Sequence, residues 1–493
     1  MATNTSTQGT SALDRWFHIT ERGSTLSTEI RGGLVTFVTM AYIVVLNPLI
    51  IGTVPDKFGN LISGDPISNP ANIGHSIVLV SAGTALIAGV MSILMGAIGR
   101  FPVALAAGLG LNGFLAFTIA PQMSWPEALG LMIIGGLIMF ALVLSGFRLA
   151  VFRAVPEALK YSIGAGIGLF IALIGLTDAG IVRTGVPLIT FGVFGQLAGW
   201  PIFTFVFGLL LIMVLVALRI RGGILIGLLA TTVLAVIIEA TAKVGPMKDN
   251  TGAVTNPTGW GLNVPKMPAK AIDFTNPMGL WHFNLTGGVQ AVGVLTAVIL
   301  IFSLLLSDFF DSIGTVTGLA NEAGLIQEDG EIEHIREILV VDSVAVMAGA
   351  AGGVSSNTAY IESASGVGDG ARTGIASIVT GAMFLVALFL APLTQVVPYE
   401  AATPALVVVG FLMFTQIRKI PMDDYALAIP CFLTIILMPF TYSITNGVGA
   451  GIVSYVLIKV CQRKFSEISV IMWIISLAFV AYFAINPLTQ LIK

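Results

Sequence analysis

Apolar runs of about 20 residues, separated by polar loops, recur along the whole chain. A helix of about 20 mostly apolar residues spans the hydrocarbon core of a bilayer. Only 10% of the residues are charged, against about 25% in soluble domains. The pattern therefore predicts an all-α polytopic membrane protein of about 14 transmembrane segments and not a soluble enzyme. The main runs lie at 32–52, 77–98, 126–146, 162–181, 201–218, 222–240, 288–313, 338–352, 374–397, 405–417, 425–444 and 447–460, with a last run at 470–485.

The two halves of the chain resemble each other. Segment 222–234 is similar to 446–458, and the end of the first span at 49–53 is similar to 311–315. An odd number of spans separates each pair, so the second copy is inverted relative to the first. Inverted repeats are typical of secondary transporters and place the substrate site near the membrane midplane. We expect an N-terminal segment at 1–30, a first repeat at 31–240, an extracellular loop at 241–285, a second repeat at 286–462 and a C-terminal hydrophobic segment at 463–493.

The basic residues predict the orientation of the chain. Lys and Arg gather in the cytoplasmic loops of membrane proteins. If Arg15, Arg22 and Arg31 lie in the cytoplasm, alternation of the spans places most other short basic loops there as well. We therefore expect a multi-pass plasma-membrane protein with a cytoplasmic N-terminus. The two cysteines and four histidines lack metal-ligand spacing, so we expect no metal site and no cofactor.

The segment 101–119 (FPVALAAGLGLNGFLAFTI) is short and rich in glycine. Its Gly108, Gly110 and Gly113 have dinucleotide-binding spacing, but no strand–turn–helix context of that kind surrounds them. We interpret it as a broken membrane element, extended to about Ala107 and helical from about Gly108. Irregular backbone at membrane depth survives where it lines a cavity, and Asn112 would offer its amide there. The alternative is an ordinary glycine-rich packing helix.

The segment 353–367 (GVSSNTAYIESASGV) is the counterpart in the second half. Ser355 to Thr358 supply polar groups, and Glu362 follows on the expected half-helix. A carboxylate at membrane depth costs about 2.5 kcal/mol or more, so intramembrane acids usually serve function. We interpret Glu362 as a substrate anchor; the alternative is a structural hydrogen bond to another helix.

The third candidate is 303–315 (SLLLSDFFDSIGT), at the end of an apolar run. Asp308 and Asp311 are three residues apart and share a helix face. Two nearby carboxylates in a low dielectric do not both ionise easily, so one is expected to hold a proton, as a proton-coupled carrier requires. The alternative is a helix end at which both aspartates are solvated. Asp342, near the start of another span, is expected to reach water.

These motifs resemble purine permeases of the nucleobase–cation symporter family, in the azaguanine-type (AzgA-like) branch. The resemblance runs over nearly the whole chain and is most specific at GLGLNGF, SDFFDSIGT and NTAYIESASGVGDGARTG, which begin at Gly108, Ser307 and Asn357. It implies a seven-plus-seven inverted repeat with crossed strands in the third and tenth segments. It also implies a core domain of spans 1–4 and 8–11 and a gate domain of spans 5–7 and 12–14. It suggests a homodimer.

The resemblance further implies proton-driven uptake of adenine, guanine or hypoxanthine. The family's binding acids on the eighth and tenth spans correspond to Asp311 and Glu362, although either Asp308 or Asp311 can face the ligand. Glu362 can accept two N–H donors from a flat purine, and Phe114, Phe309 or Phe310 can stack on the ring. The expected substrate-binding set is Asn112, Asp308, Asp311, Glu362, Gly110 and Thr358, with Asp308, Asp311 and Glu362 coupling protons. A sodium-coupled carrier of another small polar solute is the alternative; nucleic acid is not expected as a partner.

Overall fold

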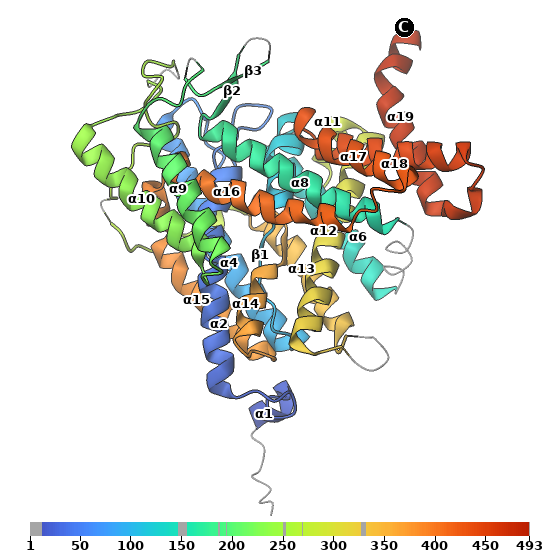
Figure 1. Cartoon of the computed structure of the whole chain (residues 1–493), viewed down its shortest axis with the longest axis horizontal. Helices are drawn as coiled ribbons and strands as arrows, with labels where there is room; N and C mark the ends of the chain where they lie inside the picture. Colours follow the sequence, from blue (N-terminus) through green and yellow to red (C-terminus); the bar gives the residue numbers. More distant parts are fainter. Residues whose placement is uncertain are drawn as a thin grey trace, which may run out of the picture.

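The computed structural model describes residues 12–145, 155–185, 188–193, 195–249, 253–268, 270–326 and 332–492 (Figure 1). Within these ranges ten helices are long and apolar enough to cross a membrane, and shorter apolar helices lie near the C-terminus. Helices make up most of the described chain, and the strands form only two two-stranded sheets. The protein is therefore the all-α membrane protein that the apolar runs predicted.

The first half of the chain contains a broken segment among its long helices. Strand β1 (Leu105–Ala107) leads into the short helix α5 (Leu109–Phe114), which continues as a π-helical turn to Ile119. A hairpin of β2 (Val182–Thr184) and β3 (Ile189–Phe191) follows α8. The other helices are α1 (Ala12–Phe17), α2 (Leu26–Met40), α3 (Ile43–Ile51), α4 (Pro70–Leu94), α6 (Trp125–Leu144), α8 (Glu157–Asp178), α9 (Trp200–Ala217) and α10 (Gly223–Ala242).

The second half repeats this order. Strand β4 (Asn357–Ala359) leads through a 3₁₀ turn into the short helix α14 (Ala364–Gly368). The remaining helices are α11 (Gly287–Val292), α12 (Val294–Ala323), α13 (Ile335–Ala351), α15 (Gly374–Ala387), α16 (Tyr399–Phe414), α17 (Tyr425–Phe440), α18 (Ile444–Cys461) and α19 (Val470–Ile492). Helix α12 continues to Ala323 instead of ending near 313, because the chain beyond 313 remains largely apolar. Asp308 and Asp311 consequently lie inside a helix and not at its end.

Local signals in the sequence fix where several helices begin. Ser124 and Glu127 form a capping box at the start of α6, in which the Ser124 backbone N–H donates to Glu127 Oε2 at 2.8 Å. The side chain of Asn69 caps α4, and Pro70 occupies its first position. Such caps satisfy backbone donors that an α-helix leaves without a partner. Capping matters more in a bilayer than in water, because lipid chains cannot accept a hydrogen bond from an unpaired backbone N–H.

The helices pack in two groups. In one group α15 packs against α2 and α4, and α13 against α6; in the other α16 packs against α8 and α9, and α17 against α8 and α18. Glycines set the closest approaches within each group. A Cβ on Gly168 of α8 would lie 2.5 Å from the Gly410 carbonyl of α16, and a Cβ on Gly381 of α15 would lie 2.5 Å from the Gly89 carbonyl of α4. Small residues at these crossings let the backbones approach, as is usual between membrane helices.

Ion pairs connect the two groups at the end of the molecule that carries α1 (Figure 1). Asp369, between α14 and α15, accepts a hydrogen bond from Arg221 in the turn between α9 and α10. Arg31 Nε of α2 donates to the same carboxylate at 2.5 Å. Partial burial opposes ionisation of Asp369, but the bonds from Arg221 and Arg31 outweigh it and hold the pKa of Asp369 below its ordinary value. The pair therefore stays charged at neutral pH.

Candidate substrate site

The two broken segments meet as an antiparallel pair of strands at the centre of one helix group. Ala106 of β1 lies opposite Thr358 of β4. The Gly108 N–H extends the ladder by donating to the Ser356 carbonyl at 2.9 Å. The pairing satisfies backbone groups that would otherwise be unbonded at membrane depth. Both segments are therefore broken membrane elements, and 101–119 is not an ordinary packing helix.

Neighbouring helices hold the extended backbone in place. Ser92 Oγ of α4 donates to the Leu105 carbonyl at 3.0 Å and accepts from the Leu105 N–H at 2.9 Å. The Ser377 hydroxyl of α15 lies 2.8 Å from the Phe101 carbonyl and 2.9 Å from the Val103 carbonyl. These bonds anchor β1 and the residues before it, so the start of α5 is held at a fixed position.

Glu362 lies in the 3₁₀ turn that follows β4. Its side chain is half-buried, and the hydroxyl of Tyr42 donates to Oε1. Tyr42 stands between α2 and α3 and is 0% exposed. The Thr39 hydroxyl also lies 3.3 Å from the Glu362 backbone carbonyl. The end of α2 therefore determines where the Glu362 carboxylate points.

Asp311 is the aspartate that faces Glu362. Its side chain is exposed, and its carboxyl lies close to the Thr358 hydroxyl and within electrostatic reach of Glu362. A Cβ on Gly314, one helical turn further along α12, would meet no atom within 4 Å. Asp311, Thr358 and Glu362 therefore form a polar cluster on an accessible face of α12.

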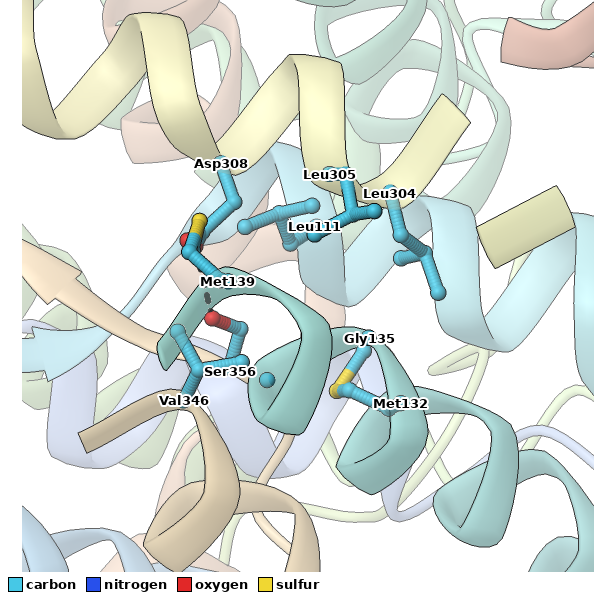
Figure 2. Close-up of a pocket in the computed structure, with 10 residues that line it drawn as sticks. Leu111, Met132, Gly135, Met139, Leu304, Leu305, Asp308, Val346 and Ser356 are labelled. Atoms are coloured by element: carbon cyan, nitrogen blue, oxygen red, sulfur yellow. Dashed lines mark hydrogen bonds between the residues drawn. The ribbon is translucent and has the colours of Figure 1, made fainter. Parts of the chain in front are cut away.

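Asp308 is turned into the protein instead. It is 3% exposed, and Ser356 Oγ donates to its Oδ1 at 2.7 Å (Figure 2). A cavity of about 10 Å³ beside it is lined by Leu111, Met132, Gly135, Gly136, Met139, Leu304, Leu305, Asp308, Val346 and Ser356. Such a space holds at most about one water molecule. Asp308 thus supports β4 from behind and is separate from the accessible cluster.

Two expected site residues are in contact with neighbouring helices: Gly110 is half-buried and Asn112 is enclosed. A Cβ on Gly110 would lie 2.7 Å from Ile167 Cγ2, so this glycine permits α5 to approach α8. Asn112 is 0% exposed, and neither atom of its amide has a hydrogen-bond partner among the residues that the structure describes. Packing accounts for both positions, and their contact with a substrate stays a prediction.

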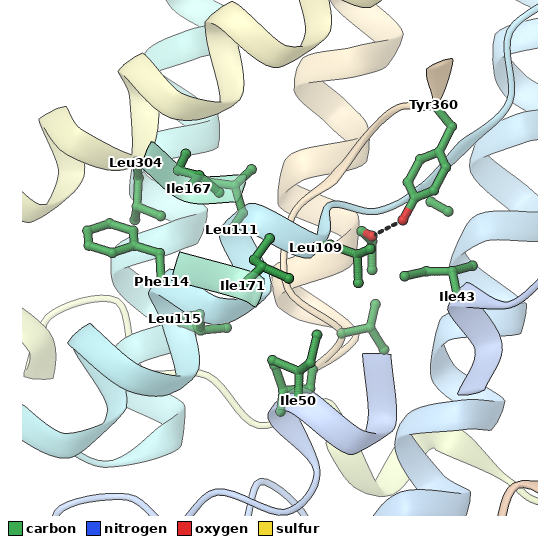
Figure 3. Close-up of a cluster of buried hydrophobic side chains, with 14 of the residues drawn as sticks. Ile43, Ile50, Leu109, Leu111, Phe114, Leu115, Ile167, Ile171, Leu304 and Tyr360 are labelled. Carbon is green, nitrogen blue, oxygen red and sulfur yellow. Dashed lines mark hydrogen bonds between the residues drawn. The ribbon is translucent and has the colours of Figure 1, made fainter. Parts of the chain in front are cut away.

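The expected aromatic partners are also core residues. Phe114 is 0% exposed and lies among apolar side chains such as Leu115 and Ile171 (Figure 3). Phe309 is 5% exposed and packs against Met139. The side chain of Phe310 lies outside the described residues. Phe114 and Phe309 are therefore core residues, and their stacking on a substrate ring stays a prediction.

Two further residues could not be placed from sequence. Tyr42 was overlooked, although a tyrosine inside a strongly apolar span is a polar signal that points to a buried partner. Asp342 was expected to reach water, but it is 0% exposed and its Oδ1 accepts from Ser312 Oγ at 2.8 Å. It ties α13 to α12 and is a structural residue.

Solved structures of the same fold are membrane transporters. The transmembrane domain of the cyanobacterial bicarbonate transporter BicA matches with a TM-score of 0.54 at 15% identity, over 87% of this chain and 97% of that one. The murine anion transporter Slc26a9 in its inward-facing state matches with a TM-score of 0.57 at 13% identity, over 88% of this chain and 68% of that one. The chain therefore has the seven-plus-seven inverted-repeat fold of these structures.

Sequence relatives narrow the class. Residues 27–450 match the Permease family (Xan_ur_permease), and this chain belongs to that family, which is not a family of enzymes. The guanine/hypoxanthine permease PbuG of Bacillus subtilis (strain 168) is 37% identical over 96% of this chain and 99% of that protein. The adenine permease AdeQ of Escherichia coli (strain K12) is 33% identical over 95% of each.

Proposed function

We propose that this protein imports the purine nucleobases adenine, guanine and hypoxanthine together with protons. The observation that carries the proposal is the pairing of Asp311 with Glu362 in front of the crossed strands. Full-length relatives that carry guanine, hypoxanthine and adenine in their names support the substrate class.

The chemistry of the cluster suits a purine. A purine is flat, mostly neutral and edged with N–H donors, and a carboxylate accepts two such donors in a bidentate pair. Tyr42 engages Glu362 Oε1 and orients the carboxylate. Thr358 contributes a hydroxyl that both donates and accepts. Bases that lack the matching N–H pattern would cover these groups without bonding to them and would be rejected.

The same two acids offer a place for the coupling proton. Asp311 and Glu362 lie within electrostatic reach of each other. A proton held by one of them relieves the repulsion between the two carboxylates. Binding of substrate to Glu362 then changes the free energy of protonation of Asp311, which is the linkage that symport requires. Asp308, enclosed behind β4, keeps its strand in place and is not needed to hold the transported proton.

Alternating access would follow from movement of one helix group against the other. We assign α2–α6 and α12–α15 to a core domain, and α8–α10 and α16–α18 to a gate domain, because helices pack within these groups. Asn321 and Glu322 continue the accessible face of α12 from Asp311 toward the α1 end. Polar side chains on this face suit a water-filled path rather than lipid. With the N-terminus in the cytoplasm, that path would lead inward.

We also propose that the protein is a homodimer in the plasma membrane, as the family resemblance suggests.

Uptake by purine-uptake-deficient cells tests the proposal. Glu362→Gln and Asp311→Asn are expected to reach the membrane in normal amounts and to lose uptake of labelled adenine, guanine and hypoxanthine. A protonophore is expected to stop uptake by the wild type, and removal of sodium to leave it unchanged. Full uptake by both variants would reject the site. Uptake that depends on sodium and survives the protonophore would favour a sodium-coupled carrier instead.

A further inference from the structure

A second cavity lies at the opposite end of the molecule from α1, where α8 ends and α16 begins (Figure 1). Its volume is about 370 Å³. Its lining includes Asp178, Arg183, Ile189, Met247, Gly261 and Glu400. Asp311, Thr358 and Glu362 do not line it, so the cavity is distinct from the central site.

A buried carboxylate in this cavity lacks a partner for one oxygen. Glu400 is 3% exposed, and its Oε1 accepts from the Gly261 N–H at 2.9 Å. Its Oε2 has no hydrogen-bond partner within the described ranges. The carboxyl of Asp178 lies within electrostatic reach of Glu400. Buried polar atoms are nearly always hydrogen-bonded. An enclosed, unpartnered oxygen on a side chain that lines a cavity of this size therefore points to a ligand with a donor, which Glu400 would meet when its carboxyl turns into the cavity.

The other groups of the cavity limit the kind of ligand. Arg183 lies within electrostatic reach of Glu400 and donates through Nε to the Gly180 carbonyl at 3.0 Å. Its positive charge opposes binding of a simple cation. Ile189 and Met247 add apolar surface, which a metal ion would not use. Acceptors, a donor and apolar walls together suit a flat heterocycle that carries both N–H donors and ring acceptors, and the volume falls in the usual range for small-molecule sites.

We propose that this cavity is a second binding site for a purine-class heterocycle, which is received there before it enters the central site. The inference rests on the proposed function, because it assumes that purines are the cargo. In this site the carboxyls of Glu400 and Asp178 accept the N–H donors, and Arg183 donates to an acceptor on the ring edge. Tyr399, next to Glu400, donates from its hydroxyl to Thr53 Oγ1 at 2.8 Å. It thereby links the cavity to the end of the first span.

Equilibrium binding of labelled hypoxanthine, guanine and adenine to the purified full-length protein in lipid nanodiscs tests the inference. We expect two equivalents per chain in the wild type and one in Glu362→Gln. Glu400→Gln is expected to keep the central site and to weaken the second by about tenfold or more, since a hydrogen bond to a charged group contributes on this scale. Ile189→Trp fills the mouth of the cavity without altering a carboxylate and should have the same effect. Asp273→Asn, which changes an exposed acid in the long loop, is the matched control.

The outcomes separate the two proposals. One equivalent in the wild type that is unchanged by Glu400→Gln and by Ile189→Trp would overturn the second site and leave the proposed function intact. Absence of purine binding to the wild type would overturn the proposed function itself. If sodium or methylammonium raises the melting temperature of the wild type but not of Glu400→Gln, and purines do not, the cavity is a cation site and the inference is wrong. Ile189→Trp keeps the test decisive if Glu400→Gln folds poorly.

Discussion

Replacement of Tyr42 by phenylalanine tests how the central carboxylate is held. The tyrosine is 0% exposed, and its hydroxyl donates to Glu362 Oε1. Phenylalanine keeps the ring and removes only the donor. A hydrogen bond to a charged group contributes about 1.5–3 kcal/mol, so the KM for uptake is expected to rise about tenfold to a hundredfold. The effect should appear in KM because, without the Tyr42 hydroxyl, the Glu362 carboxylate must be oriented each time a substrate binds. That ordering reduces the net free energy of binding.

Initial rates of labelled guanine, hypoxanthine and adenine uptake, normalised to protein at the cell surface, measure this effect. Tyr360→Phe is the matched control, because the Tyr360 hydroxyl is also buried but donates to the Ala107 carbonyl at 2.6 Å. It should lower the melting temperature with little change in KM. A wild-type KM in Tyr42→Phe, or an equal rise in KM in Tyr360→Phe, would refute the role assigned to Tyr42.

Three further changes test the surrounding structure. Ser356→Ala removes the donor to Asp308 and should destabilise the purified protein by about 1–3 kcal/mol, seen as a lower melting temperature; an unchanged melting temperature would contradict the contact. Gly168→Ala should reduce the amount of folded protein, because its Cβ would lie 2.5 Å from the Gly410 carbonyl; normal yield and melting temperature would refute this packing. The pKa of Asp369 is lowered, so its contribution is present at neutral pH and is lost only as the pH falls through this lowered value. Asp369→Asn should therefore change the uptake rate equally at pH 6 and pH 8, and a difference confined to pH 6 would count against that ion pair.

Some features of the site follow from sequence because they are local. The polar and glycine-rich segments around Gly108 and Glu362 cannot form ordinary lipid-facing helices, so their broken geometry was predictable. The sequence could not predict whether Asp308 or Asp311 faces the substrate, because residues three apart lie on the same face of a helix. The contact between Ser356 and Asp308 turns one aspartate inward, which favours Asp311 as the aspartate that faces the ligand. Tyr42 could not be assigned either, since 320 residues separate it from Glu362.

The backbone of the site is pseudosymmetric, because the two repeats contribute similar crossed strands, but the side chains that the two repeats contribute differ. β1 and β4 come from opposite repeats, and each leads directly into a short helical segment. The acids Asp311 and Glu362 both come from the second repeat, whereas the corresponding element of the first repeat carries Asn112 enclosed by packing. A second pair of acids on the first repeat would add repulsion between carboxylates in the same site. The first repeat contributes Tyr42 instead, a neutral donor that fixes the charged groups of the other half.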